Sequence, residues 1–119
     1  MLHSIHDFSI IGISVENPEK MLVHLSDEFS KKKYDLVIDG VRKVAVDGFG
    51  LQNVVLDLKV FYSFDGSFEF RRSCHLLGLA YAGPEDFPQG DSMVFIEASV
   101  GAEIACLVKG VWSFEVTEL

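Results

Sequence analysis

The chain has 119 residues, of which 49% are hydrophobic and 24% are charged. A chain of this length makes a single domain, residues 1–119, which buries roughly two-thirds of its unfolded surface and can fold alone. Ten Phe, three Tyr and one Trp indicate a substantial core and exclude a disordered chain.

The formal net charge of −8 is unevenly distributed. Residues 1–60 contain seven basic and nine acidic residues, whereas residues 61–119 contain three basic and nine acidic residues. Such acidity disfavours nucleic acids and anionic membranes as partners, because both carry negative charge. It favours a basic partner protein, although net charge of this size also simply keeps a protein in solution.

Neither the N-terminus nor the cysteines point to export. The apolar run 10–13 is too short for a secretory signal, and no run approaches the roughly twenty apolar residues of a membrane span. We therefore expect a cytoplasmic protein. Cys74 and Cys106 lie in apolar surroundings without a C-x-x-C motif, which predicts two buried free thiols.

Alternation of apolar and polar residues dominates the sequence and predicts strands, because successive strand side chains point to opposite faces. The alternating runs are 11–15, 34–38, 54–62, 68–71, 94–99, 104–108 and 112–116. Asp-Gly pairs at 39–40, 47–48 and 65–66 can supply the positive φ of tight turns, and the pair at 65–66 predicts a hairpin between aromatic runs. Residues 82–92 contain two prolines and two glycines, which predicts a long loop.

Two segments are ambiguous. Residues 18–29 carry a helix-start signal in Asn17-Pro18-Glu19, yet Met21, Val23 and Leu25 also alternate as in a strand. Strands on both sides favour the strand. Residues 71–81 can hold a short helix through their leucines, and the sequence does not decide it.

These elements predict an all-β fold with at most one short helix, arranged as an antiparallel β-sandwich or partly open barrel. Such strands leave edges that must be closed, charged or paired, and Lys59 and Lys109 are candidate edge guards. Because the apolar content is also high, we expect that the chain can form a homodimer.

The long loop supplies the candidate partner-binding residues. Glu85, Asp86 and Asp91 surround Phe87, and an exposed aromatic ringed by acids would make an anchor for a partner. The alternative is a solvated loop with Phe87 tucked beneath it. Glu97 and Glu103 flank the turn at 100–102 and are expected on outer strand faces.

No motif predicts chemistry or a cofactor. His3, His6 and Asp7 are candidate metal ligands by residue type, but the alternative is a polar segment in which His6 and Asp7 hydrogen-bond to a loop. The sequence has no Gly-x-Ser-x-Gly elbow or phosphate-binding loop. We therefore predict no catalytic residue, no metal site and no cofactor.

Four short segments of the sequence together resemble a known group of proteins. They are His6-Asp7, Asp39-Gly40-Val41, the stretch 48–54 (GFGLQNV) and the stretch 96–102 (IEASVGA). In this order they resemble a group of small bacterial β-rich proteins, some of which are classed as immunity proteins of polymorphic toxin systems. The resemblance implies a protein that binds and inhibits a toxin without performing chemistry.

The sequence thus favours a non-catalytic protein-interaction module, such as an immunity-type inhibitor of a basic partner. One alternative is a small-ligand-binding β-barrel, which the many aromatic residues would suit. The other is a small hydrolase or isomerase, which would need His6, Asp7 and the loop acids to meet in one pocket.

Overall fold

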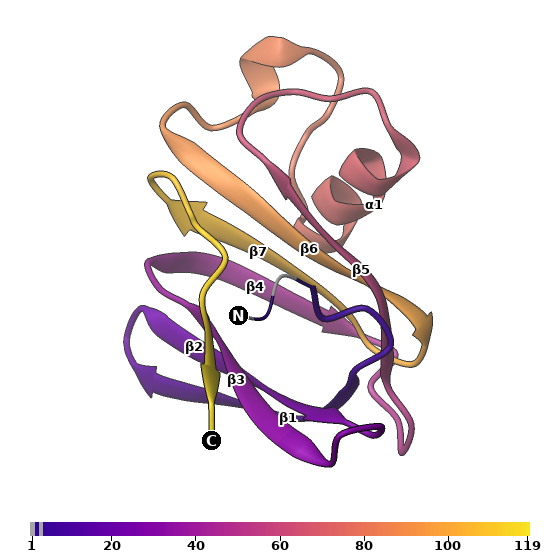
Figure 1. The fold of residues 1–119 in the computed structure, drawn as a ribbon. Helices are drawn as coiled ribbons and strands as arrows, with labels where there is room; N and C mark the ends of the chain where they lie inside the picture. The colour runs from indigo at the N-terminus through magenta and orange to yellow at the C-terminus, as the bar shows by residue number, and fades with distance from the viewer. Residues whose placement is uncertain (1, 3) are drawn as a thin grey trace.

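Eight antiparallel strands and one helix make up the computed structural model, which describes residues 2 and 4–119 (Figure 1). The elements in chain order are β1 (Ser9–Asn17), β2 (Lys20–Asp27), β3 (Lys32–Ile38), β4 (Val41–Asp47), β5 (Val54–Phe61), α1 (Phe68–Leu77), the 3-10 turn η1 (Pro84–Asp86), β6 (Asp91–Val100), β7 (Glu103–Lys109) and β8 (Val116–Glu118). The strands form one open sheet in the order β4-β7-β6-β5-β1-β2-β3-β8. The predicted all-β class with one short helix is confirmed.

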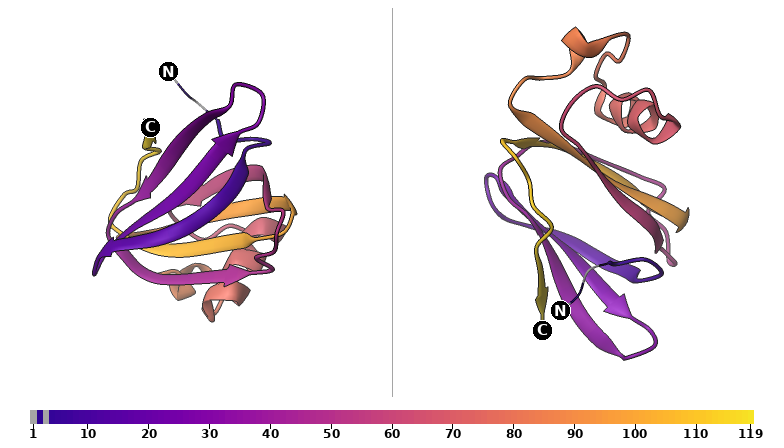
Figure 2. Two further views of the ribbon diagram at one scale, coloured as in Figure 1. Left: turned by 90° about the horizontal axis from the view of Figure 1, so that it is seen from below. Right: turned by 45° about the horizontal axis from the view of Figure 1, so that its top comes forward.

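The sheet bends sharply at its middle. β1 and β5 pair only through Ser9 and Val54, so the sheet turns over at this junction. The β6 half (β4, β7, β6 and β5) then faces the β2 half (β1, β2, β3 and β8), with strands crossing at a wide angle (Figure 2). The result is sandwich-like, although a single continuous sheet supplies both layers.

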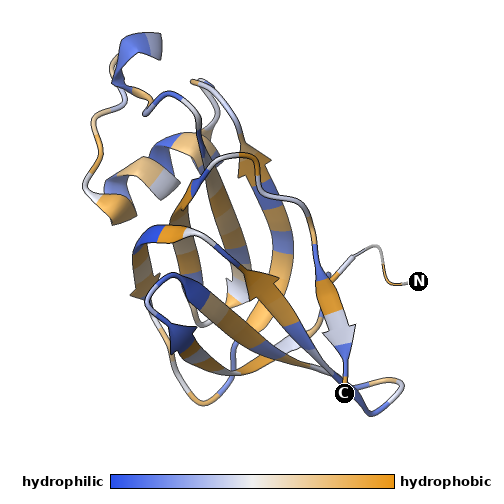
Figure 3. Ribbon diagram, turned by 90° about the vertical axis from the view of Figure 1, so that its left-hand side faces the viewer, coloured by the Kyte–Doolittle hydropathy of each residue, from blue (hydrophilic) through white to orange (hydrophobic). Residues whose placement is uncertain are grey.

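The main core fills the space between the two halves. Its buried side chains alternate along the strands, so hydrophobic and hydrophilic bands alternate in Figure 3. On the β6 half they include Val94, Ile96, Ile104 and Cys106, and on the β2 half Met21, Val23, Leu25, Leu36 and Ile38. These side chains occupy the room that a ligand would need inside a barrel.

A second core lies on the outer face of the β6 half, beneath α1. Phe70, Cys74 and Leu77 follow helical spacing and are each 1% exposed. They pack with Met93 and Phe95, the β6 residues that point away from the main core. β6 is therefore buried on both faces, which its nearly continuous apolar sequence allows.

The predicted hairpin at Asp65-Gly66 and the predicted strand 68–71 are both wrong, because α1 begins here. The Ser67 hydroxyl caps the helix by accepting from the Phe70 N–H at 3.2 Å, and its own O–H donates to Asp65 at 2.7 Å. A capped helix satisfies the backbone and buries one apolar face, which a lone hairpin here would not. The helix ends at Gly78, whose φ of 71° is the left-handed conformation of a C-cap.

Some of the other predicted elements are confirmed and some are not. Residues 20–27 are a strand, as the sequence favoured, and Gly40 and Gly48 have the predicted positive φ. β4 had no predicted run of its own. Of the run 112–116, only Val116 lies in a strand, as the first residue of β8. The predicted loop 82–92 includes η1 and ends where β6 begins at Asp91. In the described part of the chain, no helix has the length and apolarity that crossing a membrane requires.

Candidate functional site

The loop that holds the predicted partner-binding residues lies beyond α1. Phe87 is 8% exposed, and its ring stacks on that of Phe70 with centroids 5.9 Å apart. The idea of Phe87 as an exposed anchor is therefore wrong, and the alternative that it is tucked beneath the loop is correct. Its apolar area is already used in the second core.

Two of the three loop carboxylates have structural contacts. Asp86 accepts from the N–H groups of Ala82 and Gly83 at 2.9 and 3.2 Å, which caps η1. Asp91 pairs with Arg42 at 3.1 Å, and its side chain is only 10% exposed. Glu85 is exposed to solvent. The loop therefore presents less free negative charge than its sequence indicates.

The N-terminal candidates are described in part. His6 Nδ1 and Asp7 Oδ2 lie 3.2 Å apart, both side chains are largely exposed, and His3 lies outside the described residues. Asp7 donates its backbone N–H to Val55 in β5, whereas η1 with Glu85 and Asp86 lies at the far end of the molecule (Figure 1). The structure does not bring these groups into one pocket. Among residues 2 and 4–119, no group of three or more His, Cys, Asp or Glu is placed to hold a metal ion.

A row of carboxylates crosses the outer face of the β6 half. Asp47 of β4 lies opposite Glu103 of β7, and Asp57 of β5 lies opposite Glu97 of β6. The β6–β7 ladder pairs Ile96 with Ile104, so Glu97 and Glu103 are the next residues on those neighbouring strands. We call Asp47, Glu103, Glu97 and Asp57 the carboxylate row.

The direction of these side chains follows from strand alternation. Ile96 and Ile104 point into the main core, so the adjacent Glu97 and Glu103 point outward. Adjacent strands are about 4.8 Å apart, so a row across four strands spans roughly 14 Å. This length suits an extended basic surface better than a single metal ion.

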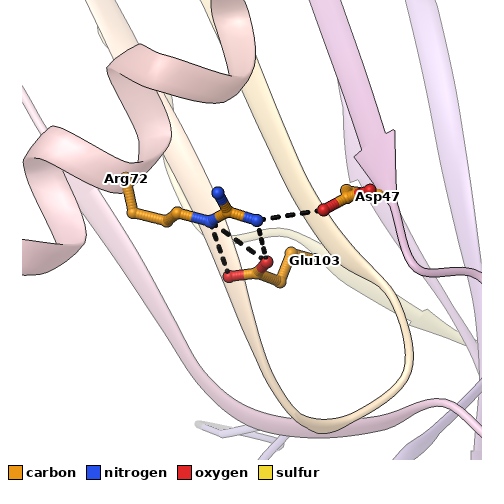
Figure 4. A network of polar contacts seen from close by, with 3 residues as sticks. All are labelled: Asp47, Arg72 and Glu103. Carbon is orange, nitrogen blue, oxygen red and sulfur yellow. Dashed lines mark hydrogen bonds and ion pairs between the residues drawn. The ribbon is translucent and has the colours of Figure 1, made fainter.

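Two basic side chains flank the carboxylate row. Arg72 of α1 donates from Nη2 to Glu103 at 2.7 Å and to Asp47 at 2.9 Å, and from Nε to Glu103 at 3.2 Å (Figure 4). The hydrogen bond to Glu103 is the main reason that the pKa of Arg72 is raised. The guanidinium therefore fixes one end of the carboxylate row against α1.

Lys59 stands near the other end. Its Nζ lies 3.0 Å from Glu69 Oε1 of α1. This hydrogen bond, with smaller contributions from Asp57 and Glu97, raises the pKa of Lys59, and the Glu69 pKa is lowered. With Glu69, five carboxylates share two basic groups, so the surface keeps a net negative charge. It forms a broad acidic face beside α1.

Sequence reasoning found half of this site. It placed Glu97 and Glu103 on outer faces but did not connect them with Asp47 and Asp57. Each of the four acidic residues occupies a polar position in the alternation of its own strand, and this alternation is visible in the sequence. Their alignment depends on which strands are neighbours, which alternation does not encode.

Sequence reasoning also missed a polar chain on the β2 half. Ser14 of β1, His24 of β2 and Asp35 of β3 are joined by two hydrogen bonds across the outer face. Each residue occupies an outward position of an alternating strand, so by itself it resembles any polar residue that faces solvent. Pairing of the three strands brings them together.

Both cysteines are buried free thiols, as the sequence predicted. Burial raises the pKa of Cys106 to about 12 and also raises that of Cys74. A thiolate is the reactive form of cysteine, so these thiols are poor nucleophiles in the folded protein.

No protein-family model matches the chain, and no curated protein or solved structure matches it.

Proposed function

We propose that this protein is an interaction module that binds a basic partner protein through the carboxylate row. The observation that carries the proposal is the alignment of Asp47, Glu103, Glu97 and Asp57 across four adjacent strands. Carboxylates directly opposite one another in a sheet are destabilising. Lys59 offsets part of the repulsion between Asp57 and Glu97, and a basic partner would relieve more of it.

Charge on the whole chain supports the same proposal. The net charge of −8 steers basic proteins toward the molecule and speeds their encounter. We further propose that the partner is a toxin, as the resemblance to immunity proteins implies. The acidic surface fits a basic toxin, such as a nuclease. The carboxylate row acts in binding here and performs no chemistry.

The alternative functions receive less support. The main core occupies the space between the halves of the sheet, where a ligand-binding barrel would hold its ligand. His6, Asp7 and the loop acids do not meet, which removes the arrangement that the hydrolase or isomerase hypothesis required.

The test is capture of partners from a lysate of the source cell, using the tagged full chain and mass spectrometry. It is run at about 0.1 M and about 1 M salt, between which the screening length falls from roughly 10 Å to roughly 3 Å. We expect one stoichiometric basic protein at low salt and its loss at high salt. Purification of that protein then allows the dissociation constant to be measured.

A pair of double variants locates the interface. D57N/E97Q removes two charges from the carboxylate row without touching the contacts of Arg72. E16Q/E115Q removes two charges from exposed positions on the β2 half and its flanking segment, and is the matched control. We expect D57N/E97Q to weaken binding by roughly tenfold, about 1.4 kcal/mol, and the control to change it little. Equal effects of the two variants, or no partner at either salt concentration, would overturn the proposal.

A further inference from the structure

Three side chains on the outer face of the β2 half form a continuous hydrogen-bonded chain. Ser14 Oγ lies 2.9 Å from His24 Nε2, and His24 Nδ1 lies 2.6 Å from Asp35 Oδ1. One imidazole nitrogen faces a hydroxyl and the other faces a carboxylate. This is the connectivity by which a base and an orienting acid activate a serine.

The strand register builds this chain. His24 lies opposite Asp35 in the β2–β3 ladder and opposite Gly12 in the β1–β2 ladder. A Cβ atom on Gly12 would come within 3.3 Å of His24 Cδ2, so glycine leaves room for the ring to lie over β1. Ser14 lies two residues further along β1, on the same face, within reach of Nε2.

The contact with Asp35 fixes the role of His24 Nδ1. A carboxylate only accepts hydrogen bonds, so His24 Nδ1–H donates to Asp35. When the ring is neutral, Nε2 is an acceptor and the Ser14 hydroxyl donates to it. The His24 and Asp35 side chains are 31% and 15% exposed. The hydrogen bonds between the three side chains are therefore partly shielded from water, while Nε2 is held at the surface.

We propose that Ser14 is a nucleophile that accepts acyl groups from small esters, with His24 as its general base and Asp35 as a positioning residue. Ser14 Oγ attacks the ester carbonyl carbon while its proton moves to His24 Nε2. The carbon–oxygen bond to the alcohol then breaks, and the alcohol leaves with that proton. Water, deprotonated by His24, releases the acid from Ser14 in the same manner.

The surroundings narrow the substrate. Leu22 lies opposite Ser14 and is half-buried, so an apolar side chain lies beside the hydroxyl for a short acyl group. Beyond Ile10, the edge of β1 that faces away from β2 is not paired with β5, because the β1–β5 ladder contains only Ser9 and Val54. Backbone N–H groups along that edge are the donors available to a developing oxyanion. An open surface of this kind favours activated or small esters over long chains.

The experiment is covalent labelling of the full chain with a fluorophosphonate probe, followed by peptide mapping. The serine oxygen displaces fluoride from the probe, so the reaction reports the same nucleophile. We expect Ser14 to be labelled at least tenfold faster than Ser99, an exposed strand serine whose hydroxyl bonds to the Val54 carbonyl. Hydrolysis of p-nitrophenyl acetate is measured alongside.

Variants separate activation from simple exposure. S14A should abolish labelling at this position and ester hydrolysis, whereas S99A should preserve both. H24Q and D35N should slow labelling of Ser14 at least tenfold, and D35E should restore part of the rate because it returns a carboxylate to Nδ1. Circular dichroism and thermal melting establish that each variant is folded.

Labelling of Ser14 no faster than Ser99 in the wild-type protein would overturn the proposal, and this comparison needs no variant. Unchanged labelling in folded H24Q would overturn it as well. The carboxylate row lies on the opposite outer face, so these outcomes are independent of partner binding.

Discussion

Asp57 and Glu97 face each other across the β5–β6 ladder, on the outer face of the sheet. Like charges in this position are unfavourable by about 0.2–1 kcal/mol. We predict that D57N or E97Q raises the free energy of unfolding by an amount in this range. The measurement is urea denaturation at low salt, where repulsion between exposed charges is least screened.

The matched control is E85Q, which removes an exposed carboxylate from the loop before β6. It should change the unfolding free energy little. A single substitution in the carboxylate row that stabilises the fold while weakening partner binding would identify a surface kept for binding rather than stability. Destabilisation by both D57N and E97Q would show that these carboxylates serve the fold.

The ion pair between Lys59 and Glu69 predicts a dependence of stability on pH. The pKa of Glu69 is lowered from 4.5, chiefly by a backbone hydrogen bond and the bond from Lys59, so folding favours its ionised form. The resulting stabilisation is present above pH 4.5 and is lost as pH falls through the folded pKa. The raised Lys59 pKa has the opposite sign, so its contribution is lost as pH rises above 10.5.

We therefore expect E69Q to flatten the acid side of the stability profile and K59M to flatten the alkaline side. Urea denaturation from about pH 3 to about pH 11 measures both effects, because this range includes the ordinary pKa values of Glu and Lys. E118Q is the control, because Glu118 makes only a long 3.7 Å contact with Lys32 at an exposed position. If the unfolding free energy of E69Q falls with decreasing pH as steeply as that of the wild type, the prediction is wrong.

The burial of Phe87 predicts that truncating its ring harms the fold. Phe87 stacks on Phe70, which also meets Phe61 and Phe64 edge to face. We expect F87A to lower the free energy of unfolding by roughly 3 kcal/mol, as is typical when a buried aromatic is removed. Under conditions where F87A remains folded, its affinity for a partner should match that of the wild type. A stable F87A with lost binding would return Phe87 to the interface.

Alternation in the sequence located most strands because a strand buried on one face must repeat every second residue. β2 illustrates this: Met21, Val23 and Leu25 face the main core, which outweighs the helix-start signal at Pro18. The error at Asp65-Gly66 has a local cause. Asp-Gly is compatible with a turn, but Ser67 immediately after it is a helix cap, and only the apolar outer face of β6 provides α1 with a surface to cover.

The sites depend on information that alternation lacks. Asp47 and Glu103 become neighbours only because β4 pairs with β7. The two-residue connection Asp39-Gly40 is typical of a hairpin, yet β3 and β4 are not neighbours in the sheet. Ser14, His24 and Asp35 likewise depend on the register of three strands. A shift of one residue in either ladder would turn one of them inward.

β4 supplies the last prediction, which concerns self-association. It is the first strand in the sheet order, so in the described chain one of its edges has no strand beside it. Val44 and Val46 point toward the main core side yet are 44% and 43% exposed. Lys43 and Asp47 lie on the opposite face of the same strand.

Two copies of β4, paired antiparallel about Ala45, would match each other. Lys43 would lie opposite Asp47 of the partner copy, and Val44 would lie opposite Val46. We therefore expect a concentration-dependent homodimer, measured by size-exclusion chromatography with light scattering. K43D and D47K should each be monomeric, because each places like charges opposite one another twice.

An equal mixture of K43D and D47K is the decisive sample. One chain then carries two acids at these positions and the other carries two lysines, so a mixed dimer restores both ion pairs. We expect this mixture to dimerise although neither variant does so alone. A wild-type chain that stays monomeric at the highest accessible concentration would contradict the prediction, and so would a mixture that stays monomeric. Dimers of both single variants would place the interface elsewhere, because like charges at these positions would then not prevent association. Dimerisation of the mixture alone excludes misfolding as the cause, because opposite charge on one chain does not refold another.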